Sequence, residues 1–412
     1  MNMQPVRPVA PVMSERRVSL IGAALVAIGP ISMSLFTPAM PEIVHAFGTT
    51  EAAVKMTLSV YFAGFAFAQL VCGPLSDGLG RKPVTFGFLG IYVVGSLIAL
   101  VAPTIEALIV ARLIQGFGAA VGVAVSRAVV RDLFTKERSA RIMNLIGMIL
   151  AVGPAFAPTL GGITMEVAGW HAIFLLMVAV GVGLMVAVHF CLVETVKRDL
   201  SRIRPRALAK SYGMLLATPY FVLCSVVLGA AVGALYTQAT VLPFIMMERV
   251  GLTATQFGLA MLMQTGGYFL GAVTVRQFIG RIGALRLVPI GLVFVGVSAV
   301  LLFALLHLLP PSLFNVMGPV ALGAFGIAFM TPALTTAVLA PFPQNAGAAS
   351  SLSGFVQMGG GLLGGSICAL IGEPVTALAT VIPAMGLISI VAWLLWQRVP
   401  EPALPLPVDG ND

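Results

Sequence analysis

Long apolar segments follow one another along almost the whole chain, and they restrict its fold more than any other feature. Of the 412 residues, 59% are hydrophobic and only 9% are charged, whereas soluble domains carry about 25% charged residues. A helix needs about 20 apolar residues to cross the hydrocarbon core of a bilayer. We therefore predict an all-α integral membrane protein with twelve transmembrane helices, at residues 18–38, 54–74, 83–103, 107–129, 141–163, 170–192, 219–243, 257–277, 284–308, 312–339, 347–371 and 376–396.

Basic residues gather in alternate connections between these segments. With a cytoplasmic N-terminus, the cytoplasmic side holds all of the 23 lysines and arginines except Lys55, Arg112 and Arg249. Such an excess is the usual sign of the cytoplasmic side of a membrane protein. Both termini are therefore predicted to be cytoplasmic. The formal net charge of +8 reflects membrane orientation, and we expect no nucleic-acid partner.

A polar, basic stretch from Glu194 to Ser211 divides the chain near its middle. Internal duplication supports this division, since Ile279-Gly280-Arg281 follows Leu79-Gly80-Arg81 by 200 positions and each precedes an apolar segment. In transporters built from such repeats the substrate site lies between the halves. The predicted parts are a cytoplasmic tail (1–17), an N-terminal six-helix bundle (18–192), a basic cytoplasmic linker (193–213), a C-terminal six-helix bundle (214–397) and a second cytoplasmic tail (398–412).

The connection between the second and third segments is short and charged, with the sequence Gly73-Pro74-Leu75-Ser76-Asp77-Gly78-Leu79-Gly80-Arg81-Lys82. It resembles the signature loop of the major facilitator superfamily (MFS) of secondary transporters. An ordinary positive loop would account for Arg81 and Lys82, but not for the glycines and the acid at their spacing. The resemblance implies two pseudo-symmetric bundles of six helices. It also implies that Asp77 and Arg81 form a conformational switch near the start of span 11, at residues 347–350.

The fourth segment carries Arg112-Leu113-Ile114-Gln115-Gly116, which resembles the Arg-x-x-Gln-Gly motif of the same superfamily. A charge at a helix centre costs about 2.5–3.5 kcal/mol on insertion scales, so Arg112 should face the protein interior or a watery cavity. The resemblance implies a role for Arg112 in proton coupling. The alternative is an arginine that extends to the outer interface.

The fifth segment contains Gly153-Pro154-Ala155-Phe156-Ala157-Pro158-Thr159-Leu160-Gly161-Gly162. It resembles the Gly/Pro-rich motif of the antiporter branch, with alanine in place of the glycine before the second proline. Gly153, Pro154, Pro158, Gly161 and Gly162 carry the match. Glycines let another helix approach closely, and we expect the partner to be Gly267-x-x-x-Gly271 in span 8. The alternative is ordinary packing of a kinked helix.

Further motifs resemble the bicyclomycin/chloramphenicol-resistance (Bcr/CflA) subgroup of multidrug efflux proteins. They are Arg127-Ala128-Val129-Val130-Arg131-Asp132-Leu133-Phe134, Gly169-Trp170-His171-Ala172-Ile173-Phe174, Leu192-Val193-Glu194-Thr195 and Ala346-Gly347-Ala348-Ala349-Ser350. The resemblance implies drug:proton antiport by alternating access, xenobiotic transport and antibiotic resistance, in the cell inner membrane. It also implies a part for Asp132 in coupling or switching.

One departure concerns the first segment, where the subgroup usually has an acid four residues before the first proline of a Pro-x-x-Pro pair. Here that position is Ser34, before Pro38. None of the fifteen acidic residues lies at the centre of a span, so Glu42, Asp77 and Asp132 are the candidates at the membrane edge. An acid at position 34 is predicted to pair with Arg112. Without it, a facilitator of a neutral or anionic metabolite stays open as an alternative function.

Neutral polar residues are scattered over the spans of both halves. A large apolar pocket with a few hydrogen-bonding groups suits varied lipophilic substrates. An interhelical hydrogen bond is the alternative role for each residue. The predicted cavity residues are Ser34, Gln115, Tyr236, Gln238, Gln264, Tyr268 and Gln357.

The leading functional prediction is an exporter of small amphiphilic compounds, with protons as the coupling ion and the lipid bilayer as its surroundings. An enzyme is disfavoured, because the four histidines are scattered and no group of residues has catalytic or metal-ligand spacing. No nucleotide-binding loop occurs. We expect no cofactor, no metal and a monomer.

Overall fold

The computed structural model describes residues 13–134, 136–200, 203 and 205–402. Within these ranges every regular element is a helix, which confirms the all-α prediction. The first half comprises α1 (Glu15–Phe36), η1 (Thr37–Ala39), α2 (Met40–Phe47), α3 (Glu51–Leu79), α4 (Arg81–Leu100), α5 (Ile105–Ala119), α6 (Val121–Leu133) and α7 (Lys136–Cys191).

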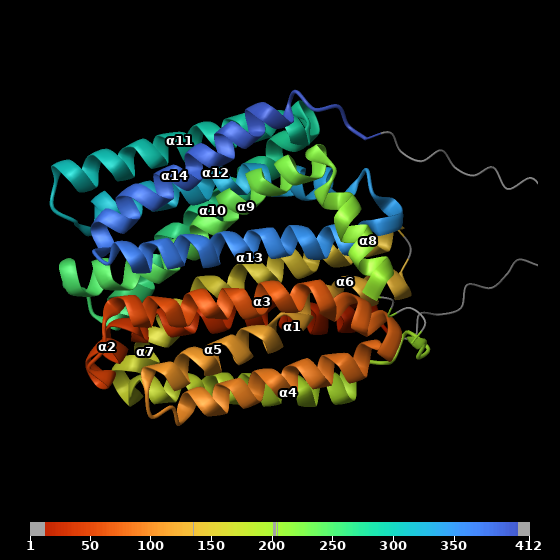
Figure 1. The fold of residues 1–412 in the computed structure, drawn as a ribbon, viewed down its shortest axis with the longest axis horizontal. Coiled ribbons are helices and arrows are strands. Elements are labelled where there is room, and N and C mark those ends of the chain that lie inside the picture. The colour runs from red at the N-terminus through yellow and green to blue at the C-terminus, as the bar shows by residue number, and fades with distance from the viewer. Residues whose placement is uncertain (1–12, 135, 201–202, 204, 403–412) are drawn as a thin grey trace, which may run out of the picture.

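The second half begins with a helix inside the predicted linker, which the sequence did not indicate. Its elements are α8 (Pro205–Leu216), α9 (Pro219–Pro243), η3 (Phe244–Arg249), α10 (Ala254–Ile282), α11 (Ala284–Leu308), α12 (Leu313–Leu339), η4 (Pro343–Asn345), α13 (Ala346–Ile371) and α14 (Pro374–Trp396). Figure 1 shows the long helices side by side, with α8 across one end of the bundle. We call this end, where Arg81, Arg131 and the linker lie, the basic end.

Eleven helices in the described ranges are long and apolar enough to cross a membrane. The count is one below the predicted twelve because α7, with 56 residues, covers two of the predicted spans. Its first part passes Gly22 and then Leu35 of α1, and its last part returns to the basic end, where Arg17 donates a hydrogen bond to the Phe190 carbonyl. The chain reverses at Gly169, whose φ is 75°. The number of membrane crossings and the side on which the termini lie stay predictions.

The predicted signature loop is shorter than expected. Residues 73–79 complete α3, and α4 begins at Arg81, so Gly80 alone separates the two helices. Its φ of 108° lies in the region that only glycine adopts readily. The carboxylate of Glu194 accepts hydrogen bonds from the backbone amides of Arg81 (2.9 Å) and Lys82 (3.0 Å). These bonds satisfy two of the free amides at the start of α4.

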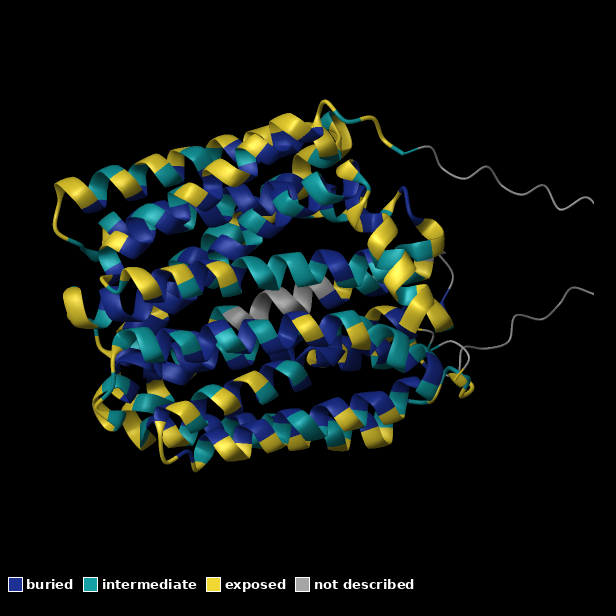
Figure 2. Cartoon of the chain, in the orientation of Figure 1, coloured by how far each residue is buried: buried dark blue, intermediate teal, exposed yellow. Residues whose placement is uncertain are grey.

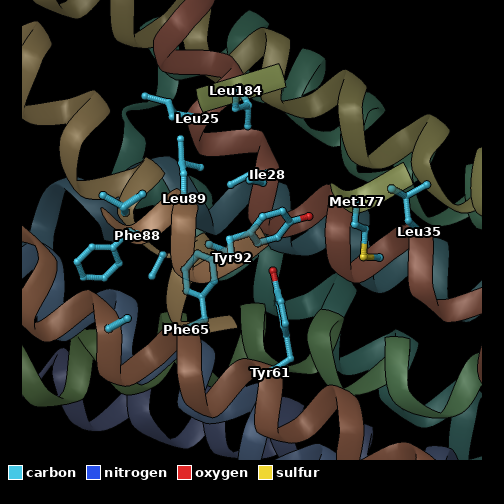
Figure 3. Close-up of a cluster of buried hydrophobic side chains, with 14 of the residues drawn as sticks. Leu25, Ile28, Leu35, Tyr61, Phe65, Phe88, Leu89, Tyr92, Met177 and Leu184 are labelled. Atoms are coloured by element: carbon cyan, nitrogen blue, oxygen red, sulfur yellow. The ribbon is translucent and has the colours of Figure 1, made fainter. Parts of the chain in front are cut away.

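Buried apolar side chains fill each half. One large cluster lies mainly in the first half, and three smaller clusters of described residues lie in the second. Figure 2 shows the buried faces turned toward the neighbouring helices. In the first cluster, Tyr61 and Tyr92 lie between aliphatic side chains such as Ile28 and Leu89 (Figure 3).

The two halves meet mainly where α3 packs on α13 and where α7 packs on α10. At the basic end, Tyr212 of α8 donates a hydrogen bond to the Leu70 carbonyl of the first half over 2.8 Å, while Ser211 donates to Asn345 of the second half over 3.0 Å. At the opposite end, the backbone amide of Thr255 donates to Glu166 over 2.9 Å. Contacts between the halves therefore exist at both ends.

The α7–α10 contact uses the predicted Gly162 of α7, but a different glycine of α10 from those predicted. A Cβ on Gly162 would collide with the carbonyl of Ala254, and a Cβ on Gly258 would lie 2.6 Å from the carbonyl oxygen of Pro158. Gly267 and Gly271, the expected partners, face α12 instead. Nine residues separate Gly258 from Gly267, which places the two on opposite faces of α10 at 3.6 residues per turn.

The glycines of the motif in α7 have separate neighbours. Gly161 faces the carbonyl of Leu35 in α1, within its own half, whereas Gly162 faces the second half. The prediction that both glycines seal the halves is therefore supported by the geometry for Gly162 only. The surroundings of Gly153 and Pro154, the first two residues of the motif, lie outside the described part of the structure.

We predict that Gly162→Val loosens the closure at the end opposite the basic end. Overpacking costs about 1–3 kcal/mol, which corresponds to about a 5- to 150-fold smaller population of the closed arrangement. The measurement is the labelling rate of a cysteine introduced by Thr255→Cys, which should rise. The matched control is Gly183→Val in the same helix, where a Cβ meets no atom within 4 Å. Equal labelling rates in the two variants would contradict the assignment.

Candidate functional site

A cavity of about 500 Å³ lies between the two halves, and we call it the central cavity. Helices α1, α3, α6 and α7 line it from the first half, and α9, α10, α12 and α13 from the second. Its apolar walls include Met33, Phe65, Met261 and Phe269. Its polar side chains are Ser34, Thr37, Gln69, Arg127, Tyr236, Gln264, Thr265, Tyr268, Thr331, Thr335, Ser350, Ser353 and Gln357.

Five of the seven predicted cavity residues line this space, namely Ser34, Tyr236, Gln264, Tyr268 and Gln357. Gln238 lies directly behind the wall, where its side-chain oxygen accepts a hydrogen bond of 2.6 Å from Gln264. This bond fixes the amide of Gln264, so that its other polar atom is free to meet a bound molecule. The role of these residues in substrate binding stays a prediction.

Gln115 is the second predicted cavity residue that is not part of the cavity wall. Its side chain is fully buried inside the first half, where it accepts a hydrogen bond from Arg112 and donates one of 2.6 Å to Ser96. Residues three apart lie on the same face of a helix. Arg112 and Gln115 therefore bind each other instead of reaching the cavity.

Arg112 faces the protein interior, and its exposed fraction is 0%. Its guanidinium lies 4.4 Å from the ring centres of both Phe36 and Tyr61, which is a cation–π arrangement. Two of its nitrogens, Nε and Nη2, have no hydrogen-bond partner among the described residues. The alternative of an arginine at the outer interface is thus disfavoured by its burial.

Position 34 is poorly placed to supply a partner for Arg112. Phe36, which contacts Arg112, is two residues from Ser34, so the two side chains point to opposite sides of α1. Ser34 lines the central cavity. Ser32, one turn from Phe36, points to the Arg112 side, where its hydroxyl lies 2.6 Å from that of Tyr92. An acid at position 32 would therefore approach Arg112 more closely than one at position 34.

The predicted switch residues form a charge cluster at the basic end of the first half. Arg81 is buried and lies between two acids, with Asp77 at 2.5 Å and Asp132 at 3.0 Å. It also donates to Ser76 over 2.7 Å, and Asp132 accepts a second hydrogen bond from Thr195 over 2.9 Å. The cluster thereby ties α3, α4 and α6 to the linker. In the described part of the chain Asp77 makes no hydrogen bond to residues 347–350.

A contact that the sequence did not predict joins the halves at the opposite end. The Lys55 side chain is completely buried and donates to Glu51 over 2.9 Å and to the carbonyl of Gly372 over 2.8 Å. Its ammonium also lies 5.0 Å from the ring centre of Phe244. From the sequence, Lys55 was only excluded from the basic residues of the cytoplasmic side. Its position four residues after Glu51 on one helix was the available signal.

The central cavity extends toward the basic end. Its wall includes Arg127 of α6, Ser350 of α13, and Val338 and Leu339 at the end of α12. At the other end, the contacts of Lys55 and Gly162 bring the halves together. The cavity therefore reaches toward the basic end, although contacts of Tyr212 and Arg127 also join the halves there. A cavity between two halves is the arrangement expected for an alternating-access transporter.

Comparison with known proteins agrees with this architecture. The chain is 27% identical to multidrug resistance protein D of Escherichia coli (strain K12), over 90% of this chain and 93% of that protein. It is 29% identical to the bicyclomycin resistance protein homolog of Haemophilus influenzae, over 82% and 85%. It is also 29% identical to the multidrug resistance protein MdtL of Klebsiella pneumoniae (strain 342), over 92% and 95%. These names agree with the resemblance to the Bcr/CflA subgroup.

The fold is shared with a solved transporter of another branch. A POT family transporter in complex with 5-aminolevulinic acid superposes with a TM-score of 0.74, over 92% of this chain and 96% of that chain, at 12% sequence identity. Residues 22–365 match the family profile described as Major Facilitator Superfamily. This family consists of membrane transporters rather than enzymes. The chain is thus a multi-pass membrane protein that belongs to the major facilitator superfamily.

Proposed function

We propose that the protein exports small amphiphilic compounds, including drugs, across the inner membrane by alternating access. The observation that carries this proposal is the central cavity, because residues of both halves line it. Rocking of one half against the other would change the end at which such a cavity opens, as in other transporters built from repeats. The names of the relatives support drugs as the substrate class.

Export against a gradient requires an energy source, and we infer that proton entry supplies it. The membrane-edge acids Asp77 and Asp132 are the candidates for carrying protons, and both bind Arg81. A facilitator that moves a neutral or anionic compound down its gradient is the second candidate function. Two observations favour that candidate, namely Ser34 in place of the acid and the lack of any carboxylate among the residues described in the cavity wall.

Dye efflux from cells that express the chain distinguishes the two functions. We expect cells loaded with fluorescent dyes of different charge to lose at least one dye faster than control cells, and an uncoupler to abolish the difference. Uncoupler-resistant movement that stops at equal concentrations would identify a facilitator instead. Dye retention equal to that of control cells for every dye would contradict export.

We predict that Asp77→Asn impairs transport while substrate affinity stays within about twofold. Asp77 lies at the basic end, away from the residues of the cavity wall, and its loss would leave Arg81 with Asp132 as its one acidic partner. Removing one partner of a hydrogen-bonded ion pair costs about 3–5 kcal/mol when the pair is buried and less here, because Asp77 is 42% exposed. The measurement is export rate together with substrate binding by the purified protein.

The control for Asp77→Asn is Glu15→Gln, which removes an acid of the same end that pairs with Arg138 over 3.6 Å. We expect this control to keep its export rate, since Arg138 is 60% exposed and Glu15 38% exposed, and such surface ion pairs contribute little. Full export by Asp77→Asn would exclude a switching role for Asp77.

We predict that Ser34→Asp makes export depend more steeply on the proton gradient. The new carboxylate would stand in the cavity wall, where the described residues include no other acid, so that proton and substrate would meet at one site. The measurement is export by vesicles at several imposed pH gradients. Ser32→Asp is the comparison variant, since its carboxylate would instead meet Arg112. A parent that already responds steeply, and is changed neither by Ser34→Asp nor by Arg112→Ala, would show that neither position takes part in coupling.

A further inference from the structure

We propose that the central cavity selects neutral or singly anionic amphiphiles and discriminates against organic cations, with Arg127 binding the anionic group. This inference rests on the proposed export function and specifies its substrate class. It follows from the charges around the cavity, because the described wall contains one arginine and no carboxylate.

Carboxylates are excluded from the cavity by the sequence itself. Of the fifteen acidic residues, Glu51 and Asp77 lie near the two ends of α3, and Glu166 lies beside the break of α7 at Gly169. Asp132 is likewise near the end of α6 and pairs with Arg81. The residues described in the cavity wall include none of the fifteen. A cation that enters the cavity therefore loses its water without gaining a counter-charge, and this desolvation is unfavourable.

Arg127 is the one charged side chain among the residues described in the cavity wall. It is exposed although its neighbours Ala128 and Val129 are buried, and it lines the cavity wall. No ion pair to Arg127 occurs in the described part of the chain. Arg112 of α5, in the same half, is fully buried and is not among the residues of the wall.

A hydroxyl of the second half holds the guanidinium in place. Arg127 donates a hydrogen bond to Ser350 at the start of α13. A guanidinium has five N–H donors, so this single bond leaves others for a ligand. Charge-assisted hydrogen bonds of this type to a carboxylate or sulfonate are about twice as strong as neutral ones. Because Arg127 and Ser350 come from opposite halves, an anion bound here would contact the interface that alternating access has to rearrange.

The remaining polar groups of the wall are neutral. Gln69, Gln264, Gln357 and the two tyrosines can donate or accept hydrogen bonds, while most of the surface is apolar. A neutral amphiphile gains apolar contacts here without a charge to desolvate. The cavity thus accepts neutral compounds. It binds singly charged anions through the additional contact with the guanidinium of Arg127, and it disfavours cations.

Three dansyl probes test the selection, because they share one fluorophore and differ in charge. They are dansylglycine (anionic), dansylamide (neutral) and dansylcadaverine (cationic). Binding is measured by fluorescence on the full-length protein in nanodiscs of a zwitterionic lipid, so that the lipid adds no net charge. We expect dansylglycine to bind at least about tenfold more tightly than dansylcadaverine, the ratio expected for one hydrogen-bonded charge contact, and dansylamide to lie between them.

Variants of Arg127 separate a charge effect from a loss of folding. Arg127→Gln should weaken dansylglycine binding about tenfold and change dansylamide binding less than about twofold, which also shows that the cavity is intact. Arg127→Lys should restore part of the anion binding. The control is Arg276→Gln, which removes an exposed arginine of α10 outside the cavity wall and should leave all three affinities unchanged. Gln357→Glu, which adds a carboxylate to the wall, should raise the affinity for dansylcadaverine.

Dansylcadaverine binding as tight as that of dansylglycine, or anion binding insensitive to Arg127→Gln, would overturn the inference. Failure of all three probes to bind the parent protein would overturn it as well. Export is measured separately with the same probes in vesicles. Binding with the expected preference but no movement of any probe would leave the inference standing and remove the export function, so the two proposals fail in different experiments.

Discussion

Close approach of helix backbones is the constraint on which the rest of this structure depends. Lipid tails are as apolar as the side chains, so helices in a bilayer associate through packing rather than through the hydrophobic effect. The chain has 45 glycines, and many of them stand where two helices touch. Gly122 faces the backbone of Leu25, Gly118 faces that of Tyr92, and Gly291 and Gly326 face each other's carbonyls. Side chains at these positions would separate the helices and open the cores of both halves.

Charge is the second constraint, and it indicates which contacts between helices can separate during transport. Arg81 with its two acids ties the first half into a unit at the basic end, whereas Lys55 spans the two halves at the opposite end. The contacts of Lys55 with a carbonyl and a ring are individually weaker than a fully desolvated ion pair. Contacts of that strength suit an end that has to separate in each transport cycle, while the Arg81 cluster suits a unit that moves as one body.

The sequence predicted the helices well and their faces less well. The apolar run at 284–308 has the same limits as α11, because the length of an apolar segment is set by the bilayer. Glycine pairs do not reveal which neighbour they face, so Gly267 and Gly271 were assigned to α7 although they pack on α12. Gly258 lies on the face of α10 opposite to Gly267, and which of these two faces meets α7 depends on how the halves dock. That docking is a tertiary property that no local spacing encodes.

The candidate site shows the same division. Tyr236, Gln264, Tyr268 and Gln357 were found because polar residues in apolar spans are costly unless they have a use. Gln115 was misplaced, although its distance of three residues from Arg112 predicts their mutual hydrogen bond. Arg127 was noted only as part of a motif and as one of the basic residues of the cytoplasmic side. Its place in the cavity wall depends on the depth to which the cavity extends along α6, which becomes visible only when both halves are assembled.

The positions of the acids also restrict how protons could drive transport in this chain. A carboxylate in the cavity wall would let substrate and proton compete for one site, but Ser34 removes that option and the described wall contains no other acid. Coupling would then act through Asp77 or Asp132, whose protonation weakens their attraction to Arg81. In that arrangement the proton alters the packing of α3, α4 and α6, while the substrate meets Arg127, five residues before Asp132 on α6. Proton and substrate would be linked through the movement of α6 and not through a shared binding group.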